Sequence, residues 1–425
     1  MLFVLAKFDV RVGNQVVWTS EPTDHASLPG IEFKMIPSGL HDRTRETIYF
    51  VCGSWHGVAR YEARVAGNAR TAESARMFSL AALVPMREDL PWGLEPFLAM
   101  ELRRFLDLGA STDPQSPSAK ALPTWAPLRA DPRTHPVLAA AAFLRAYGPM
   151  VFELWKSGLS RTRTLLAPIP GQSIRAMGQF TYLAAQISAL PADVAGLVPV
   201  HKHPIPLLYN VAVSDLQRLQ SAESFWATTT DGLLLTPSRD ACDFYADERM
   251  LHDLTGGSPS RASAPTWRDR RRFALLVDAL GIDATPAGSG VAEAFVDAMA
   301  TSLMWWASAG ESALMDRDET APLLSSPAGL AAVEATEPST PARSSSGLDT
   351  TSDVVALIGQ FQQYTRQFVR VFAKLADDDD ATIRVAVSDI AAMGLDPFAA
   401  SDRDFIRRFS LTWFDRPVVF TRCCC

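Results

Sequence analysis

The sequence is poor in cysteine and in long hydrophobic runs. Only 5 of its 425 residues are cysteines, and Cys52 and Cys242 each stand alone in apolar sequence. Isolated cysteines predict no disulfide framework and are typical of a reducing compartment. The first apolar run ends after about five residues at Lys7 and Asp9, whereas a membrane span needs roughly 20. We therefore expect a cytoplasmic chain that begins with a buried strand and has no transmembrane segment.

The sequence also has fewer basic than acidic residues. The chain has 40 Lys and Arg against 47 Asp and Glu, which gives a formal net charge of -7. A nucleic-acid binder needs a basic surface that displaces counterions from phosphates, so we expect no nucleic-acid partner. Apolar residues make up 48% of the chain and charged residues 20%, which is typical of a globular protein with a large core. The length predicts two or three domains.

Motifs for common enzyme classes are missing as well. The sequence has no GxxxxGK[ST], no GxGxxG after a strand and no HExxH, so phosphate cradles, dinucleotide sites and zinc-protease sites are not indicated. His201 and His203 could offer two metal ligands, but a third is missing and Pro204 follows, which favours a solvated loop. The acidic run 377–380 lacks the interleaving of an EF-hand and is interpreted as a connector. We expect no catalytic residue, cofactor or metal; a hydrolase or metal enzyme would need a site that no motif reveals.

A basic cluster follows Trp267 and has two interpretations. It could face anionic lipid or an acidic partner. The interpretation that we favour is a charged helix start whose long side-chain stems cover apolar surface. The cluster consists of Arg268, Arg270, Arg271 and Arg272.

The chain ends in three consecutive cysteines, Cys423, Cys424 and Cys425. Free thiols in an exposed tail invite oxidation, and paired terminal cysteines resemble the lipidated ends of Rab GTPases, while S-palmitoylation fits equally well. Two acyl chains anchor a protein stably whereas one anchors it marginally. The three residues are lipidation candidates that would give peripheral association with an internal membrane; a plain thiol tail, or metal or redox use, are the alternatives.

Hydrophobic periodicity divides the chain into regions of different class. Residues 1–110 read as a β-sheet lobe, with strands expected at 3–10, 16–18, 47–52, 58–65 and 75–84 and an amphipathic helix at 94–108. Residues 136–255 alternate between helix and strand, with a long helix at 136–157 kinked at Gly148, a strand at 162–167, a helix at 172–190, a strand at 205–213 and two short strands around a turn at 230–232. The expected class is therefore α/β, or α+β, in two lobes.

The remaining regions are connectors and helices. Helices are expected at 267–280, 291–308, 354–375 and 405–413, with a short strand at 418–420. The Ser-, Thr- and Pro-rich insert is expected to be disordered because few large apolar side chains offset its ordering entropy. The expected divisions after residue 110 are a linker at 111–135, a central module at 136–255, a helical part at 256–315, the insert at 316–352, a helical C-terminal part at 353–422 and the cysteine tail at 423–425.

Short motifs along most of the chain resemble DENN-domain proteins of the LCHN-like branch. The opening of the chain carries GIEFK at 30–34, PSGLH at 37–41 and YF at 49–50. The central module carries FELWK at 152–156, RTLL at 163–166, PLLYNV at 206–211, ATTTD at 227–231 and DFYAD at 243–247. The segments GLDPF at 394–398 and SDRDF at 401–405, with Trp413, resemble the C-terminal extension of fungal members.

The resemblance implies a longin-like N-terminal lobe and a larger α/β DENN lobe with a helical C-terminal part. It also implies that a groove between the lobes binds the switch regions of a Rab-family small GTPase. An exchange factor binds the nucleotide-free GTPase better than the nucleotide-bound form and needs no covalent step. The expected function is guanine-nucleotide exchange in membrane traffic; the alternative is a non-catalytic Rab-binding adaptor or tether.

The family-motif residues are interpreted mostly as structural. Phe33 is expected in the core, Gly39 in a turn and Asp231 as a turn acceptor. No single residue can be assigned to the GTPase contact from the motifs alone. The motif residues that we single out are Phe33, Lys34, Pro37, Ser38, Gly39, Trp155 and Asp231.

Overall fold

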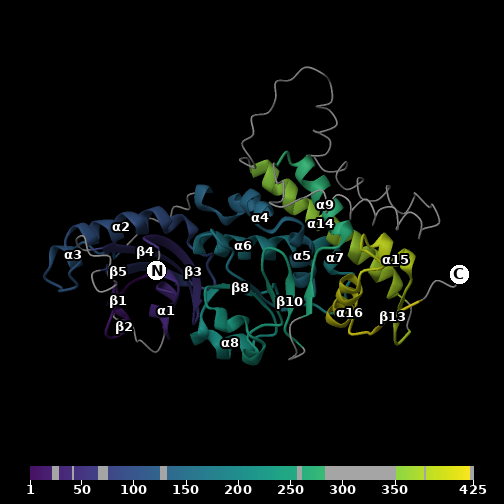
Figure 1. Ribbon diagram of the computed structural model, residues 1–425, viewed down its shortest axis with the longest axis horizontal. Helices are drawn as coiled ribbons and strands as arrows, with labels where there is room; N and C mark the ends of the chain where they lie inside the picture. Colours follow the sequence, from purple (N-terminus) through teal and green to yellow (C-terminus); the bar gives the residue numbers. More distant parts are fainter. Residues whose placement is uncertain are drawn as a thin grey trace, which may run out of the picture.

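A computed structural model describes residues 1–21, 28–40, 43–65, 75–124, 132–255, 261–282, 351–377 and 380–421. Its N-terminal lobe, central module and C-terminal part lie in a row along the long axis of the molecule (Figure 1). The predicted helix at 291–308, the predicted disorder at 316–349 and the cysteine tail lie outside the described residues.

The N-terminal lobe is an antiparallel sheet in the order β3-β4-β5-β1-β2. Alternate residues of each strand point to opposite faces, and both faces are covered. The short helix α1 (Ile31–Met35) covers one face and α2 (Glu95–Asp107) the other. The strands are β1 (Leu2–Asp9), β2 (Gly13–Thr19), β3 (Arg45–Cys52), β4 (Trp55–Val65) and β5 (Ala75–Pro85). All five predicted strands and the predicted amphipathic helix are confirmed.

Short helical segments lead from this lobe to the central module. They are η4 (Trp92–Leu94), α3 (Pro117–Lys120), η5 (Pro132–Thr134) and η6 (Pro136–Ala139). The long helix predicted at 136–157 is divided into η6, α4 (Ala140–Tyr147), η7 (Gly148–Met150) and α5 (Val151–Leu159). Gly148 has a φ of 51° and precedes a proline, which confirms the predicted kink.

The central module is a mixed sheet with α6 packed on it. β6 (Arg163–Leu166), β7 (Leu207–Val211), β8 (Phe225–Thr229) and β9 (Phe244–Ala246) run parallel, in the order β9-β6-β8-β7. β10 (Leu251–Asp253) and β11 (Arg261–Ser263) extend it antiparallel. The helices of this part are α6 (Ile174–Ile187), α7 (Ala192–Ala195), η8 (Val213–Asp215), α8 (Leu216–Ser221), η9 (Gly232–Leu235) and η10 (Pro237–Arg239).

The two short strands expected around the turn at 230–232 are present as β8 and β9, although they do not pair with each other. β8 ends before that turn, but its neighbours in the sheet are β6 and β7, and β9 lies on the other side of β6. Parallel strands need a crossover connection, which η9 and η10 provide.

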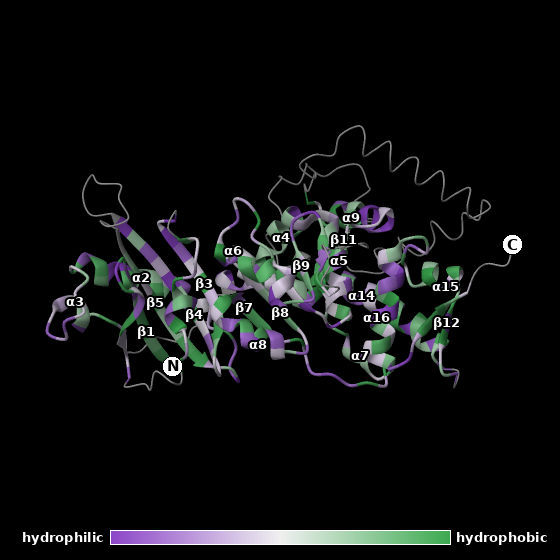
Figure 2. Ribbon diagram, turned by 60° about the horizontal axis from the view of Figure 1, so that its bottom comes forward, coloured by the Kyte–Doolittle hydropathy of each residue, from purple (hydrophilic) through white to green (hydrophobic). Residues whose placement is uncertain are grey.

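The C-terminal part is helical. It comprises α9 (Trp267–Ala279), α14 (Thr351–Leu375), β12 (Ile383–Val385), α15 (Val387–Ala392), α16 (Ala400–Phe414) and β13 (Val418–Phe420), with β12 and β13 paired in parallel. Aromatic rings of α14 and α16 pack at the centre, for example Phe368 with Phe409 at 4.7 Å between ring centroids. The helices α2 and α14 show both colours in Figure 2, as expected of helices with one face in solvent.

One described helical run, Pro136–Leu159, is long and apolar enough by length and composition to cross a membrane. The expectation that no segment would qualify is therefore wrong by that measure. In the structure the run is interrupted at Gly148 and Pro149, and every residue of α5 is buried in the protein core. A core helix passes the same test, so the run is weak evidence for a membrane span.

Candidate functional site

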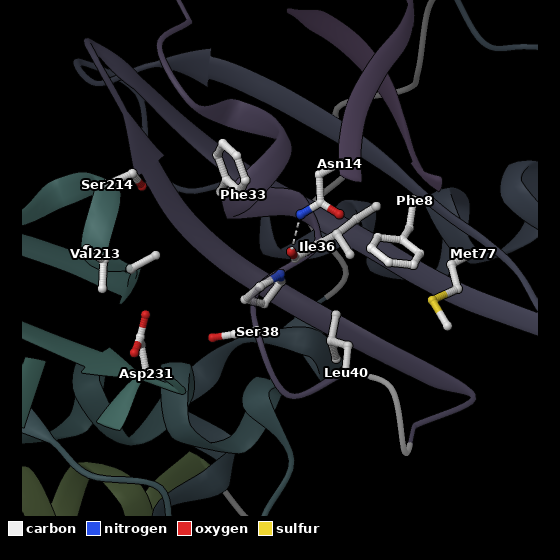
Figure 3. A pocket seen from close by; sticks show the side chains of 12 residues that line it. Phe8, Asn14, Phe33, Ile36, Ser38, Leu40, Met77, Val213, Ser214 and Asp231 are labelled. Atoms are coloured by element: carbon white, nitrogen blue, oxygen red, sulfur yellow. Dashed lines mark hydrogen bonds between the residues drawn. The ribbon is translucent and has the colours of Figure 1, made fainter. Parts of the chain in front are cut away.

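A hollow of about 350 Å³ opens where the N-terminal lobe meets the central module. Phe33, Pro37 and Ser38 line it from the N-terminal lobe, and Val213 and Asp231 line it from the central module. Figure 3 shows the two groups facing each other across the opening. We call this site the Phe33 hollow.

The N-terminal side of the hollow is shaped by α1 and the turn after it. Gly30, at a φ of 68°, and Gly39, at a φ of 86°, adopt left-handed backbone conformations on either side of this segment, and glycine adopts these without strain. The Asn14 side-chain amide donates to the Ile36 carbonyl over 2.8 Å and ties the end of α1 to β2. The turn interpretation of Gly39 is confirmed.

Phe33 is not a core residue. Its side chain is 46% exposed, while Ile31 and Met35 of the same helix are buried. In a helix, residues two positions apart lie on different sides, so Phe33 points outward while Ile31 and Met35 point inward. In a strand, all three side chains would have pointed to the same face. The expectation of a core position was therefore wrong, and the ring is available to a ligand.

The central side of the hollow is formed by the segments that follow β7 and β8. Because parallel strands end at one edge of a sheet, ligands commonly bind outside their carboxyl ends. Val213 follows β7, and Asp231 follows β8. The Asp231 carboxylate accepts from the Leu233 backbone N–H at 3.2 Å, which confirms its predicted role as a turn acceptor.

Lys34 joins the two sides beneath the hollow. Its ammonium pairs with Asp215 at the start of α8, and only 3% of the Lys34 side chain and 11% of the Asp215 side chain are exposed. Burial lowers the pKa of Lys34, and the Asp215 carboxylate opposes that shift. Asp215 also accepts from the Ala212 backbone N–H at 2.8 Å. The pair fixes α1, and with it Phe33, against the segment that carries Val213.

Further side-chain contacts bridge the lobes beside this pair. The Arg43 guanidinium donates to the Gln172 carbonyl over 2.8 Å. Glu95 at the start of α2 accepts from the Tyr49 hydroxyl and, at 2.7 Å, from the Arg175 guanidinium on α6. Burial raises the pKa of Glu95 to about 7, although Arg175 opposes the shift.

The chemistry of the Phe33 hollow is that of a binding surface. Its lining is mostly apolar, with one carboxylate, Asp231, and the hydroxyls of Ser38 and Ser214. Neither histidine nor cysteine is among the lining residues. Such a lining suits an apolar side chain of a protein partner, with a cation beside Asp231.

Trp155 lies away from the hollow. It is fully buried on α5, and its indole N–H donates to the Thr365 hydroxyl of α14 at 2.9 Å. This motif residue therefore binds the central module to the C-terminal part. The sequence motifs showed only that Trp155 and Phe33 are far apart along the chain. They did not indicate that the two residues lie at different places in the fold.

Three buried carboxylates, of Glu153, Asp269 and Asp402, lie close enough together to hold a metal ion. The ammonium of Lys156 already lies among them, at 2.8 Å from Glu153 and 2.6 Å from each of the aspartates. Burial raises the pKa of Asp402 to about 7. Four ionisable groups from α5, α9 and α16 thus form an internal cluster, which no motif in the sequence indicated.

Two weaker sequence hypotheses also have structural outcomes. The segment with His201 and His203 is an extended loop with both histidines exposed. In the basic cluster of α9, Arg268 donates to the Leu395 carbonyl at 2.9 Å and Arg272 stacks over Tyr364 at 4.8 Å. The cluster therefore packs on the C-terminal part, which confirms the favoured interpretation of a helix start with buried stems.

Comparison with known proteins gives two family matches. The sequence model of the family "DENN domain-containing protein 11" matches residues 3–116 and 110–239. The model of a domain of unknown function, DUF4484, matches residues 296–382 and 372–423.

Curated relatives carry the same family name. DENN domain-containing protein 11 of Xenopus laevis is 28% identical over 264 residues, covering 57% of this chain and 58% of the relative. The Rattus norvegicus protein of that name is 28% identical over 269 residues, with coverages of 57% and 56%. Uncharacterized protein ANR2 of Saccharomyces cerevisiae is 25% identical over 280 residues, with 54% of each chain covered.

The matched regions thus span little more than half the length of these relatives. The family match includes the strands of the N-terminal lobe and both sides of the Phe33 hollow, since it runs from residue 3 to residue 239. It bears out the fold resemblance of the short motifs and covers more than half of the 425 residues. The chain belongs to the DENN domain-containing protein 11 family.

Proposed function

We propose that the protein binds a Rab-family small GTPase across the Phe33 hollow and promotes release of its bound GDP. The observation that carries this proposal is the convergence of family-motif residues from both lobes on one exposed hollow. Four of the seven motif residues, Phe33, Pro37, Ser38 and Asp231, line it. A fifth, Lys34, fixes its two sides to each other.

The hollow offers a two-sided grip on a partner. Phe33 and Val213, which are 46% and 37% exposed, present apolar surface on opposite sides, and buried aromatic anchors contribute most to protein interfaces. An apolar residue of a GTPase switch segment would enter between them, and a basic residue beside it would face Asp231.

Exchange by this route needs no chemistry from the protein. A partner that binds the nucleotide-free GTPase more tightly than the loaded one shifts the equilibrium toward release, and holding the switch segments away from the phosphates is the physical means.

The test is a panel of Rabs loaded with fluorescent GDP, whose release is followed with and without the purified chain. Phe33→Asp and Val213→Asp place a charge on each side of the hollow, and Phe398→Asp is a matched control because Phe398 is 57% exposed in the C-terminal part. We expect faster release from one or a few Rabs, lost in both hollow variants and kept in the control. No acceleration across the panel by a folded protein would contradict exchange activity.

The same panel separates the adaptor function from exchange. An adaptor would bind the GTP-loaded Rab more tightly than the nucleotide-free form, the reverse of the preference of an exchange factor. Affinities measured for both forms therefore decide between the two, and the hollow variants would weaken binding in either case. The proposed location is the cytoplasm, with peripheral membrane association through the terminal cysteines.

A further inference from the structure

A second hollow, of about 680 Å³, lies at the same junction on the opposite face of the sheet. Its residues Leu90, Trp92 and Tyr209 belong to the core cluster under α2, whereas Ile36 and Leu40 of the Phe33 hollow belong to the cluster under α1. Both lobes contribute to its walls. We call it the Trp92 hollow, and the proposed GTPase contact makes no use of it.

Aromatic rings and prolines form its walls. The Trp92 ring meets Tyr182 at 5.9 Å and 79°, and Tyr209 at 5.5 Å and 82°, so neighbouring rings stand nearly perpendicular. Pro204 and Pro206, both exposed, line the other side. Grooves walled by aromatic rings bind proline-rich segments in the polyproline II conformation, which is preformed and therefore loses little entropy on binding.

The rim of the hollow is acidic. Glu88 and Asp89 are exposed lining residues, and no Lys or Arg is among the residues that line the hollow. Within the described part of the chain, Asp89 has no ion pair. A basic side chain of the ligand would therefore complement a carboxylate that has no cation of its own.

The chain itself carries a ligand of this chemistry. Residues 338–343 read PSTPAR. Pro338 and Pro341 are three residues apart, which places both on one face of a helix with three residues per turn. Arg343 follows two positions later and supplies the positive charge.

The segment is tethered to α14, a helix that contacts the edge of the hollow through η6. The described chain resumes at Thr351 with α14, and α14 packs against η6. His135 caps η6 and also lines the Trp92 hollow. Seven residues, 344–350, separate Arg343 from Thr351, and extended they span about 24 Å.

We infer that residues 338–343 bind in the Trp92 hollow of their own chain, with the prolines against the aromatic walls and Arg343 paired with Asp89. A short tether gives an effective concentration of about 1 mM. If the untethered segment binds the hollow with a Kd of about 0.1 mM, the tethered segment occupies the hollow about 90% of the time. The apparent affinity of a competing peptide is then lowered about tenfold.

The experiment measures binding of a fluorescein-labelled peptide of residues 338–346 to the full chain by anisotropy. One chain is unchanged; a second, P338A/P341A/R343A, lacks the tethered ligand. We expect the peptide to bind the second chain about tenfold more tightly. Adding Asp89→Lys to that chain should abolish binding, whereas Asp113→Lys, at an exposed carboxylate beside α3, should not. Melting curves confirm that each variant is folded.

A charge reversal makes the assignment of Arg343 specific. A peptide carrying Arg343→Glu should not bind the P338A/P341A/R343A chain. The same peptide should bind when that chain also carries Asp89→Lys. Equal affinity for the unchanged chain and the P338A/P341A/R343A chain would overturn the intramolecular assignment and leave a partner protein as the source of such a peptide. No binding to any of the chains would overturn the site itself.

Discussion

Replacing Lys34 with methionine should weaken the junction between the lobes more than any change in the Phe33 hollow itself. The substitution leaves the Asp215 carboxylate, 11% exposed, without its cation. Removing one partner of a buried ion pair costs about 3–5 kcal/mol because the other charge stays buried and unpaired. Asp215 keeps the hydrogen bond from the Ala212 N–H, so we expect about 3 kcal/mol, the lower end of that range.

The free energy of unfolding from urea titration measures this loss. The double variant Lys34→Met with Asp215→Asn is the control, because asparagine removes the stranded charge and still accepts from the Ala212 N–H. Most of the loss should be regained in the double variant, since apolar or neutral replacements of a buried pair are often tolerated.

The single variant Lys34→Met and the double variant with Asp215→Asn also distinguish an effect on folding stability from an effect on binding of the GTPase. Both lose the contact that fixes α1 against the start of α8, so both should bind the GTPase less tightly even where folding is regained. A loss below about 1 kcal/mol in Lys34→Met, or no recovery in the double variant, would refute the reasoning that burial of the pair determines its energy.

Three further predictions concern Phe33, Glu95 and the terminal cysteines. Phe33→Asp should change the melting temperature little, because exposed substitutions usually stay within about 0.5 kcal/mol; a large drop would show that the ring is buried after all. Glu95→Gln should flatten the pH dependence of stability: the pKa of Glu95 is raised to about 7 by burial, so its stabilising contribution is complete below the pKa of the unfolded state and is lost as pH rises toward 7. The size is on the order of 3 kcal/mol at 1.36 kcal/mol per pKa unit, and identical melting curves for the two proteins between pH 5 and 8 would contradict it. Serine in place of Cys423, Cys424 and Cys425 should leave folding intact and lower the membrane-bound fraction on cell fractionation; an unchanged fraction would exclude lipid attachment there.

Local pattern was enough to predict most elements of this fold. The apolar run of β1 and the apolar stripe of α2 are properties of neighbouring residues, and both elements lie where the sequence pattern indicated them. The pairing of β8 and β9 with β6 was not predictable in this way, because it joins segments that are distant in the chain.

The sequence predicted the local role of some residues of the candidate site, but it did not predict that these residues lie together. Turn chemistry identified Gly39 and Asp231 correctly. Nothing in the sequence placed Asp231 beside Ser38, since tertiary packing alone brings the two lobes together. Phe33 was misplaced because an apolar residue between buried ones reads as core, and only the geometry of a five-residue helix turns it outward.

The backbone contact between the two lobes is small. β3 and β7 share a single register pair, Phe50 with Tyr209, in a sheet whose other neighbours pair over several residues. Tyr209 adopts a left-handed conformation, with a φ of 55°, beside an irregularity in β7. The sheet is therefore continuous, but a single pair of residues joins its two halves in register. Side-chain contacts such as those of Lys34 and Glu95, together with the packing of α6 on β3, therefore hold the two halves of the sheet against each other where backbone pairing is sparse.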